Sequence, residues 1–175
     1  MDNNDILIRL RYALDIRDID MQNIFKLGGA DFTLEQVKKL LTKSKETYRY
    51  DNEAINPEDE NIKCNNSTLE AFLNGLIILK RGKQEPKPGQ PETSWGTNYG
   101  SNPNNMLLKK VKIALSLTSE DMLDIFQMAG VTVTKGELSA LLRREGHSNY
   151  KECGDKFARN FLKGLAIKIR GIDSY

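Results

Sequence analysis

The stretch that decides the fold occurs twice in this chain, as FLNGLIILKRG at residues 72–82 and as FLKGLAIKIRG at residues 161–171. The phenylalanine, glycine, leucine and arginine positions of the two copies coincide at a constant offset of 89. The match extends back to a pair of cysteines, Cys64 and Cys153. Internal repetition determines architecture more strongly than any local pattern does. We therefore expect two copies of one unit.

A second matching segment precedes the first in each copy. Residues 4–41 align with residues 105–142 at a constant offset of 101, including an Ile-Phe pair, a glycine, a threonine and a Leu-Leu pair. The two offsets, 101 and 89, differ by 12, so the first copy carries an insertion of 12 residues. This insertion, at about residues 50–62, holds five acidic residues and no basic one, and it predicts an acidic loop.

Each copy is predicted to form four helices. The first has apolar residues at helical spacing in both copies: Ile6, Leu7, Leu10, Ala13 and Leu14, then Leu107, Leu108, Val111, Ala114 and Leu115. Its polar side is basic, with Arg9 and Arg11 in one copy and Lys110 and Lys112 in the other. We expect this basic side to face outward.

The second and third helices are separated by a glycine and a short turn. Gly29 and Gly130 stand where a helix ends on a left-handed residue, a conformation that costs glycine little. Thr33 and Thr134 are each followed three residues later by Gln or Glu, which predicts a capping box at the start of the third helix.

The fourth helix is long and the most apolar of the four. We expect it over residues 67–81 and 156–170, with Asn66 and Asp155 as N-caps. Its apolar residues nearly encircle it, which predicts a central position: Phe72, Leu73, Leu76, Ile77 and Leu79.

A glycine lies in the interior of the fourth helix in both copies, at Gly75 and Gly164. Glycine inside a helix costs roughly 1 kcal/mol against alanine, so its presence in both copies predicts a close approach by a neighbouring helix. We expect the two copies to pack through their fourth helices at these glycines.

These patterns predict an all-α fold of two homologous four-helix repeats, related by a pseudo-twofold and packed into one bundle. Repeat 1 covers residues 1–82, a linker rich in proline and glycine covers residues 83–103, and repeat 2 covers residues 104–175. The linker contains Trp95 and Tyr99, and aromatic side chains gain from burial, so docking onto the repeats stays open.

Composition excludes several classes of protein. Mean hydropathy is −0.53, and no run approaches the roughly 18 apolar residues that a membrane span needs. The first five residues hold acid where a signal peptide needs base, and two cysteines make no disulfide framework, so a cytoplasmic protein is expected. The net charge is −2 over residues 1–82 and +4 over residues 104–175, without the basic excess typical of nucleic-acid binders.

The repeated motif resembles the bacterial YehS-like family, which has unknown function and two copies of one helical domain. The resemblance is carried by Met-x-x-Ile-Phe, a glycine, a capping threonine, Leu-Leu and Phe-Leu-x-Gly-Leu-x-Ile-x-x-Arg-Gly in tandem, and by the block Asn-Tyr-Lys-Glu-Cys at residues 149–153. Residues 61–64 depart from that block in the first copy. The resemblance implies an all-helical cytoplasmic protein, and it implies no activity, cofactor or catalytic residue.

The two cysteines are the thiol candidates. Cys64 and Cys153 precede the start of the fourth helix, and a helix N-terminus can lower the pKa of a thiol and favour a nucleophilic or redox role. The alternative is a small buried residue that closes the turn into the helix, which free cysteines often are.

No other catalytic arrangement stands out. His147 is the only histidine, and with two cysteines it cannot complete a four-ligand zinc site. The sequence has no phosphate-binding glycine loop and no Gly-x-Ser-x-Gly elbow, so we expect no metal, no cofactor and no assigned catalytic residue.

The second and third helices together have the outline of a helix-turn-helix, in which the second helix of the pair enters the major groove of DNA. Basic residues on the third helices are the candidate contacts to phosphates or bases: Lys38, Lys39 and Lys43 in repeat 1, and Arg143 and Arg144 in repeat 2. The same basic residues also fit an ordinary solvated face.

Three functional interpretations follow. The leading one is a non-enzymatic binding or regulatory protein whose partner is another protein or a second copy of the chain. The alternatives are nucleic-acid binding through the third helices and an enzyme that uses Cys153.

Overall fold

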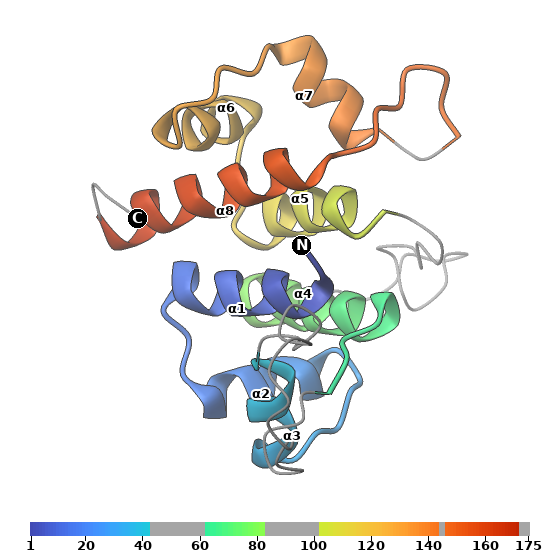
Figure 1. Ribbon diagram of the computed structural model, residues 1–175, viewed down its shortest axis with the longest axis vertical. Coiled ribbons are helices and arrows are strands. Elements are labelled where there is room, and N and C mark those ends of the chain that lie inside the picture. The colour runs from blue at the N-terminus through green and yellow to red at the C-terminus, as the bar shows by residue number, and fades with distance from the viewer. Residues whose placement is uncertain (43–61, 83–101, 144–145, 172–175) are drawn as a thin grey trace, which may run out of the picture.

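The computed structural model describes residues 1–42, 62–82, 102–143 and 146–171 (Figure 1). Within these residues the chain forms eight α-helices and no strand, which confirms the prediction of an all-α fold. The helices are α1 (Asn3–Leu14), α2 (Asp18–Leu27), α3 (Leu34–Leu40), α4 (Asn66–Arg81), α5 (Pro103–Ala114), α6 (Ser119–Met128), α7 (Lys135–Leu142) and α8 (Asp155–Arg170).

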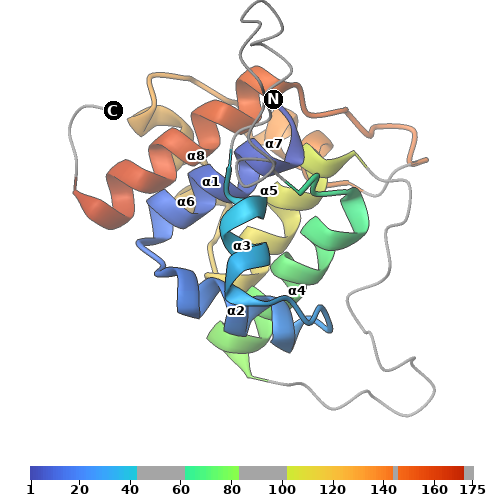
Figure 2. The same ribbon diagram turned by 60° about the horizontal axis from the view of Figure 1, so that its bottom comes forward.

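The first and fourth helices of both predicted repeats form the centre of the molecule. In Figure 1, α1, α4, α5 and α8 lie across the middle, with α6 and α7 at one end of the long axis and α2 and α3 at the other. Figure 2 brings the α2–α3 end forward and shows this pair in front of the central helices. The predicted third helices therefore lie at opposite ends of the molecule.

The four central helices run in the same direction. At their starts, the side chain of Asn3 in α1 donates to Asn66 in α4 over 2.8 Å, and that of Asn104 in α5 donates to Asp155 in α8 over 2.9 Å. At their ends, Arg81 of α4 donates to the carbonyl of Ile113 in α5 over 3.4 Å. Backbone dipoles of parallel helices add, so all four positive ends meet on one side of the molecule.

The main contacts between repeats join a fourth helix to the first helix of the other repeat. Helix α4 packs along α5, and α8 packs along α1. We predicted that the fourth helices would pack on each other, and that prediction is wrong. Reciprocal contacts of this kind are expected of two repeats related by a twofold, which stays a prediction.

The interior glycines mark crossings within each repeat. A Cβ atom at Gly75 would lie 1.8 Å from the carbonyl oxygen of Ile24 in α2, and one at Gly164 would lie 1.8 Å from that of Ile125 in α6. The predicted close approach is therefore present, but the neighbour is the second helix of the same repeat. No side chain fits such a gap, which explains glycine in both copies.

Each repeat has an aromatic core. The ring of Phe25 in α2 lies 5.1 Å from that of Phe72 in α4, and the equivalent rings of Phe126 and Phe161 are 5.6 Å apart. All four are fully buried. Leu79, by contrast, is 52% exposed, so its side of α4 is not covered, although the apolar pattern predicted burial on nearly all sides of the helix.

The helix ends follow the sequence closely. Gly29 and Gly130 have φ of +92° and +83°, as a left-handed helix end requires. Thr33 accepts from the amide of Gln36, whose side chain accepts from the amide of Thr33, so the predicted capping box forms. In the second copy Thr134 accepts from the amide of Glu137 at 3.1 Å, but the Glu137 side chain does not bond back to the Thr134 amide, so the capping box predicted there is only half formed.

The predicted N-caps of the fourth helices are wrong by one residue. Asn65 caps α4, and its side chain accepts from the amide of Thr68 at 2.7 Å, whereas Gly154 precedes α8 and has no side chain to cap with. Asn66 and Asp155 are instead the first helical residues.

Two expectations lie largely outside the described residues. These are the acidic insertion, apart from Ile62, and residues 83–101 of the predicted linker, with Trp95 and Tyr99. Pro103 was placed in that linker, but it is the first residue of α5, where its missing amide hydrogen costs nothing.

Candidate functional site

A buried asparagine in the first helix ties together three backbone segments of repeat 1. The amide group of Asn4 donates to the carbonyls of Leu40 over 2.9 Å and Ile62 over 2.8 Å. Its side-chain oxygen accepts from the backbone amide of Cys64 at 3.0 Å. Asn4 is fully buried, so these bonds satisfy groups that water cannot reach. We call this arrangement the asparagine clamp.

The asparagine clamp recurs in repeat 2. Asn105 donates to the carbonyls of Leu141 over 2.9 Å and Lys151 over 3.0 Å, and accepts from the amide of Cys153 at 2.8 Å. We did not single out these asparagines from the sequence. The sequence contained one indication of their role, which is that Asn4 and Asn105 align at the offset of 101. A polar residue found at the same buried position in two copies is expected to have the same partners in both.

Each cysteine contributes its backbone amide to an asparagine clamp. Cys64 and Cys153 are free and buried, and each sulfur lies 3.6 Å from the carbonyl oxygen of the next residue. Burial, with a smaller contribution from the nearby carboxylates of Asp2 and Asp155, raises the pKa of the Cys64 and Cys153 thiols to about 12. The direction is opposite to the lowering that a helix N-terminus can cause. Both thiols therefore stay protonated at neutral pH, and we assign them no chemistry.

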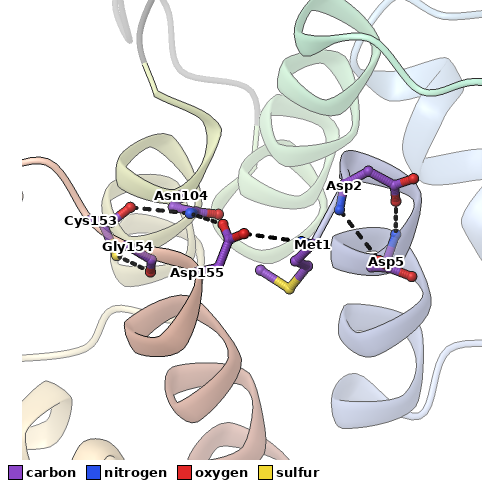
Figure 3. A network of polar contacts seen from close by, with 7 residues as sticks. All are labelled: Met1, Asp2, Asp5, Asn104, Cys153, Gly154 and Asp155. Carbon is purple, nitrogen blue, oxygen red and sulfur yellow. Dashed lines mark hydrogen bonds and ion pairs between the residues drawn. The ribbon is translucent and has the colours of Figure 1, made fainter.

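A polar network links the start of α1 to the start of α8 (Figure 3). The amino group of Met1 lies 3.0 Å from the Asp155 carboxylate, which also accepts from Asn104 at 2.9 Å. The Asn104 hydrogen bond, and then the bond from the amino group, lower the pKa of Asp155. Asn104 also donates to the Cys153 carbonyl over 3.1 Å, so the network reaches the second asparagine clamp.

A buried charged cluster lies between α4 and α5. The ammonium group of Lys110 donates to Asn74 over 2.6 Å, and Lys110 and Glu70 are only 2% and 6% exposed. Burial lowers the pKa of Lys110, while the Glu70 carboxylate acts in the opposite direction. Lys110 was predicted to face outward. It is buried because the fourth helix of the other repeat covers that side of α5.

Basic residues gather on the equivalent α1–α8 side. Helix α8 carries five basic residues and one acidic residue, Asp155. Lys156 and Arg159 are exposed, Lys163 is half-buried, and Arg9 of α1 is half-buried. We call Arg9, Lys156, Arg159 and Lys163 the basic face. None of the four has a hydrogen bond or ion pair within the described residues, although Arg159 interacts electrostatically with Asp155.

The C-terminal arginine of α8 belongs to a different contact. Arg170 donates to the backbone carbonyl of Tyr12 over 2.9 Å, lies 3.5 Å from Asp15, and stacks 4.3 Å from the centre of the Tyr12 ring. Its charge is thus used at the end of α1, where a cation also meets the negative end of the helix dipole.

The residues predicted to bind nucleic acid lie far apart, because the third helices are at opposite ends of the molecule. Lys38 is exposed and Lys39 half-buried on α3, while Arg143 is half-buried after α7, at the other end of the molecule (Figure 1). Lys43 and Arg144 lie outside the described residues. The fold thus does not bring the two predicted groups together on one short surface.

A groove runs between α6 and α7. It has a volume of about 580 Å³ and is lined by Ser119, Glu120, Lys135, Leu138, Ser139, Leu142 and Arg143. Glu120 forms an ion pair with Lys135 at 3.6 Å, and α6 carries three acidic and no basic residues. The surroundings of Arg143 are therefore mixed in charge.

The single histidine stands apart from the thiols. His147 is exposed, its Nδ1 accepts from the amide of Asn149 at 3.1 Å, and its Nε2 lies 3.4 Å from Arg143. In the described part of the chain, no three histidine, cysteine, aspartate or glutamate side chains group closely enough to hold a metal ion. Nor does any helix there have the length and apolar character needed to cross a membrane.

The comparisons with known proteins agree with the sequence resemblance. The "Uncharacterized protein YehS" of Escherichia coli (strain K12) is 38% identical over 167 residues, which span 95% of this chain and 95% of that protein. No solved structure matches significantly. The family described as "Protein of unknown function (DUF1456)" matches residues 3–82 and 104–171, one segment for each predicted repeat. The chain therefore belongs to this family of proteins of unknown function.

Proposed function

We propose that the protein is a non-enzymatic binding protein that recognises a macromolecular partner through its surface. The proposal rests on which polar side chains are bonded inside the protein and which, among the described residues, remain unpaired on its surface. Those repeated in both copies, in the asparagine clamps, hold the backbone together inside the protein. The basic face, in contrast, has cations without hydrogen bonds or ion pairs in the described residues. Unneutralised surface charge of one sign attracts a partner of the other sign.

The proposal includes a cytoplasmic location. Two free, buried cysteines fit a reducing compartment, where no disulfide would form. It also includes the division into two repeats, at residues 1–82 and 104–175, which act as one scaffold and present different charges.

The test is affinity capture from a cell extract with a matched pair of variants. The first, the face variant, replaces Arg9, Arg159 and Lys163 by glutamine. The second, the control variant, removes the same number of charges elsewhere, through Lys26→Gln, Lys80→Gln and Lys168→Gln, all at exposed positions. We expect the wild-type protein and the control variant to retain a specific macromolecule that the face variant releases.

Capture of nothing beyond the background of the beads by the wild-type protein would contradict the proposal. So would equal capture by the wild-type protein and the face variant, because recognition would then not use the basic face. Circular dichroism of both variants establishes that the fold is kept.

A second candidate is nucleic-acid binding through the third helices. The groove between α6 and α7 favours it, since Arg143 and Lys135 line one opening together with two serine hydroxyls that could contact phosphate. A gel shift at low salt with Arg143→Glu, and separately with Lys38→Glu plus Lys39→Glu, tests this candidate. An unchanged shift in both variants excludes it.

A further inference from the structure

The two sides of the central layer carry different charges at equivalent positions. By the offsets of the repeat, Arg9 corresponds to Lys110. On the fourth helices, Arg159 corresponds to Glu70 and Lys163 to Asn74. One side therefore has a base, an acid and an amide where the other side has three bases.

On the α4–α5 side the charge is compensated. Lys110 is bonded to Asn74 at 2.6 Å and interacts electrostatically with Glu70. An ammonium group out of contact with water needs such partners, because an isolated charge in a poorly polarisable surrounding is strongly unfavourable.

On the α1–α8 side the same positions have no hydrogen bond or ion pair within the described residues, and Arg159 alone interacts electrostatically with an acid, Asp155. Two contacts fix the register of these parallel helices: Met1 with Asp155 at 3.0 Å, and Arg170 with the Tyr12 carbonyl at 2.9 Å. The residue numbers of the contacting residues in α1 and α8 therefore differ by 154 at the start of the helices and by 158 near their end. Arg9 thus lies level with residues 163–167 of α8.

These three like charges lie on two packed helices, with Arg9 and Lys163 half-buried and Arg159 exposed, and they repel one another. The acidic side chains near the start of the two helices already have partners. Asp155 binds the amino group of Met1 and the side chain of Asn104, and Asp5 accepts from the amide of Asp2 at 3.3 Å (Figure 3). An external anion would relieve the repulsion.

The arrangement suits a chain of phosphates better than a single small anion. Lys156, Arg159 and Lys163 are spaced by three and four residues, so they lie in a row on one side of α8, over about 10 Å at 1.5 Å per residue. Tyr12, the exposed aromatic residue beyond the end of this row, is covered by the Arg170 guanidinium. Within the described residues this surface therefore presents no free ring on which a base could stack, and contacts to the nucleic-acid backbone remain.

We propose that the basic face binds the phosphate backbone of nucleic acid without reading its sequence. This inference rests on the proposed function, since it names the partner of the same surface. It differs from the helix-turn-helix candidate, because the contacts come from α1 and α8 in the centre and not from the third helices.

The test is fluorescence anisotropy with labelled duplex DNA and duplex RNA of unrelated sequences, measured over a range of salt concentrations. We expect the wild-type protein to bind all sequences with similar affinity. The logarithm of the affinity should fall linearly with the logarithm of salt, by about 0.9 for each phosphate contacted in duplex DNA. The face variant should bind at least about tenfold more weakly with a flatter salt slope, because it loses about three contacts.

Two variants separate the basic face from net charge and from folding defects. The control variant, with Lys26, Lys80 and Lys168 replaced by glutamine, should stay within about threefold of the wild type, since it removes the same charge elsewhere. Arg9→Lys with Arg159→Lys keeps the charges and should keep most of the binding. If the face variant fails to fold, Arg159→Gln alone, at an exposed position, should still weaken binding measurably.

Each other outcome overturns the inference. These outcomes are no binding by the wild-type protein, an equal loss in the control variant, or a loss confined to the Arg143 and Lys38/Lys39 variants. The capture experiment, repeated after nuclease treatment, separates this failure from that of the proposed function. A protein retained through the basic face after nuclease treatment keeps the proposed function and excludes nucleic acid as the partner. If the wild-type protein captures nothing even without nuclease treatment, both the proposed function and the inference of nucleic-acid binding are wrong.

Discussion

At the scale of single residues, the asparagine clamps hold each repeat together. Asn105→Ala leaves two carbonyls and one amide without partners, at Leu141, Lys151 and Cys153. Leaving buried polar groups unpaired costs about 1–3 kcal/mol each, and partial entry of water reduces the sum. We expect a loss of about 2–4 kcal/mol in the free energy of unfolding, measured by urea denaturation.

The matched control is Asn23→Ala, at an exposed position in α2. It should change stability by less than about 0.5 kcal/mol, as surface substitutions usually do. Equal effects of the two substitutions would show that Asn105 does not have the role described.

The buried thiols give a prediction about pH. Burial, with a smaller contribution from nearby carboxylates, raises the pKa of Cys64 and Cys153 from an ordinary 9.0 to about 12. A raised pKa stabilises the fold fully below the unfolded value and progressively less as pH rises toward the folded value. Between about pH 9 and 12 the wild-type protein should therefore lose more stability than a variant with both cysteines changed to alanine.

The measurement is chemical denaturation of both proteins at a series of alkaline pH values. A thiol-specific reagent adds a second test, since both thiols should react slowly in the native protein and quickly in denaturant. Fast reaction of native Cys153 would favour the interpretation of a reactive thiol.

Single residues also show the limits of the sequence. Arg9 and Lys110 occupy equivalent positions on the polar side of the first helix, and the pattern predicts that both face outward. Lys110 is buried because α4 covers it, and that contact involves residues far away in sequence. Helical periodicity describes one helix at a time, so it cannot identify which polar side a second repeat will cover.

At the scale of helices, the glycine crossings decide how the second and fourth helices meet. Alanine at Gly164 would place a methyl group 1.8 Å from the Ile125 carbonyl oxygen, and a backbone atom cannot move aside as a flexible side chain can. The helices must separate, and the core around Phe126 and Phe161 must open. We expect Gly164→Ala, and likewise Gly75→Ala, to lower the unfolding free energy by at least about 2 kcal/mol.

Gly136 in α7 provides the matched control, since the nearest atom to an added Cβ is the Thr134 hydroxyl at 4.0 Å. Alanine there should stabilise the protein by up to about 1 kcal/mol, through helix propensity. Thermal unfolding followed by circular dichroism compares the variants. A neutral or stabilising Gly164→Ala would disprove the close crossing.

Most helices could be predicted because both copies carry the same signals. The Thr33 capping box and the left-handed Gly29 and Gly130 are local features, and the structure contains them. The N-cap of α4 was misplaced by one residue because Asn65 and Asn66 are both good caps, and only the fold selects between them. The partner of the interior glycines was also misassigned, since a repeated glycine indicates a crossing without naming the other helix.

At the scale of the whole molecule, the two predicted repeats pack against each other through their central helices. Helix α4 packs on α5, and α8 packs on α1. If the first helix of either repeat unfolds, the fourth helix of the other repeat therefore becomes exposed to solvent. We therefore expect one cooperative unfolding transition. Asn4→Ala, in repeat 1, should speed hydrogen exchange in α8 of repeat 2 as well as in α4. Faster exchange confined to repeat 1 would mean that the repeats are independent.

The resemblance between the repeats predicted this arrangement only in part. Two matched segments implied two similar units, and the basic and acidic substitutions between them implied different surfaces. The place of the basic face could not be predicted, because it combines Arg9 of one repeat with Arg159 and Lys163 of the other. Those helices are adjacent only after the repeats have packed.

The most direct test of the central claim is to cut the chain between its repeats. A specific protease site is placed within residues 83–101 of the predicted linker, the protein is cleaved, and native mass spectrometry follows the two pieces. The reciprocal packing of α4 on α5 and α8 on α1 predicts one particle close to the intact 19.9 kDa, which separates only in denaturant. Separation of the pieces under native conditions would contradict the account.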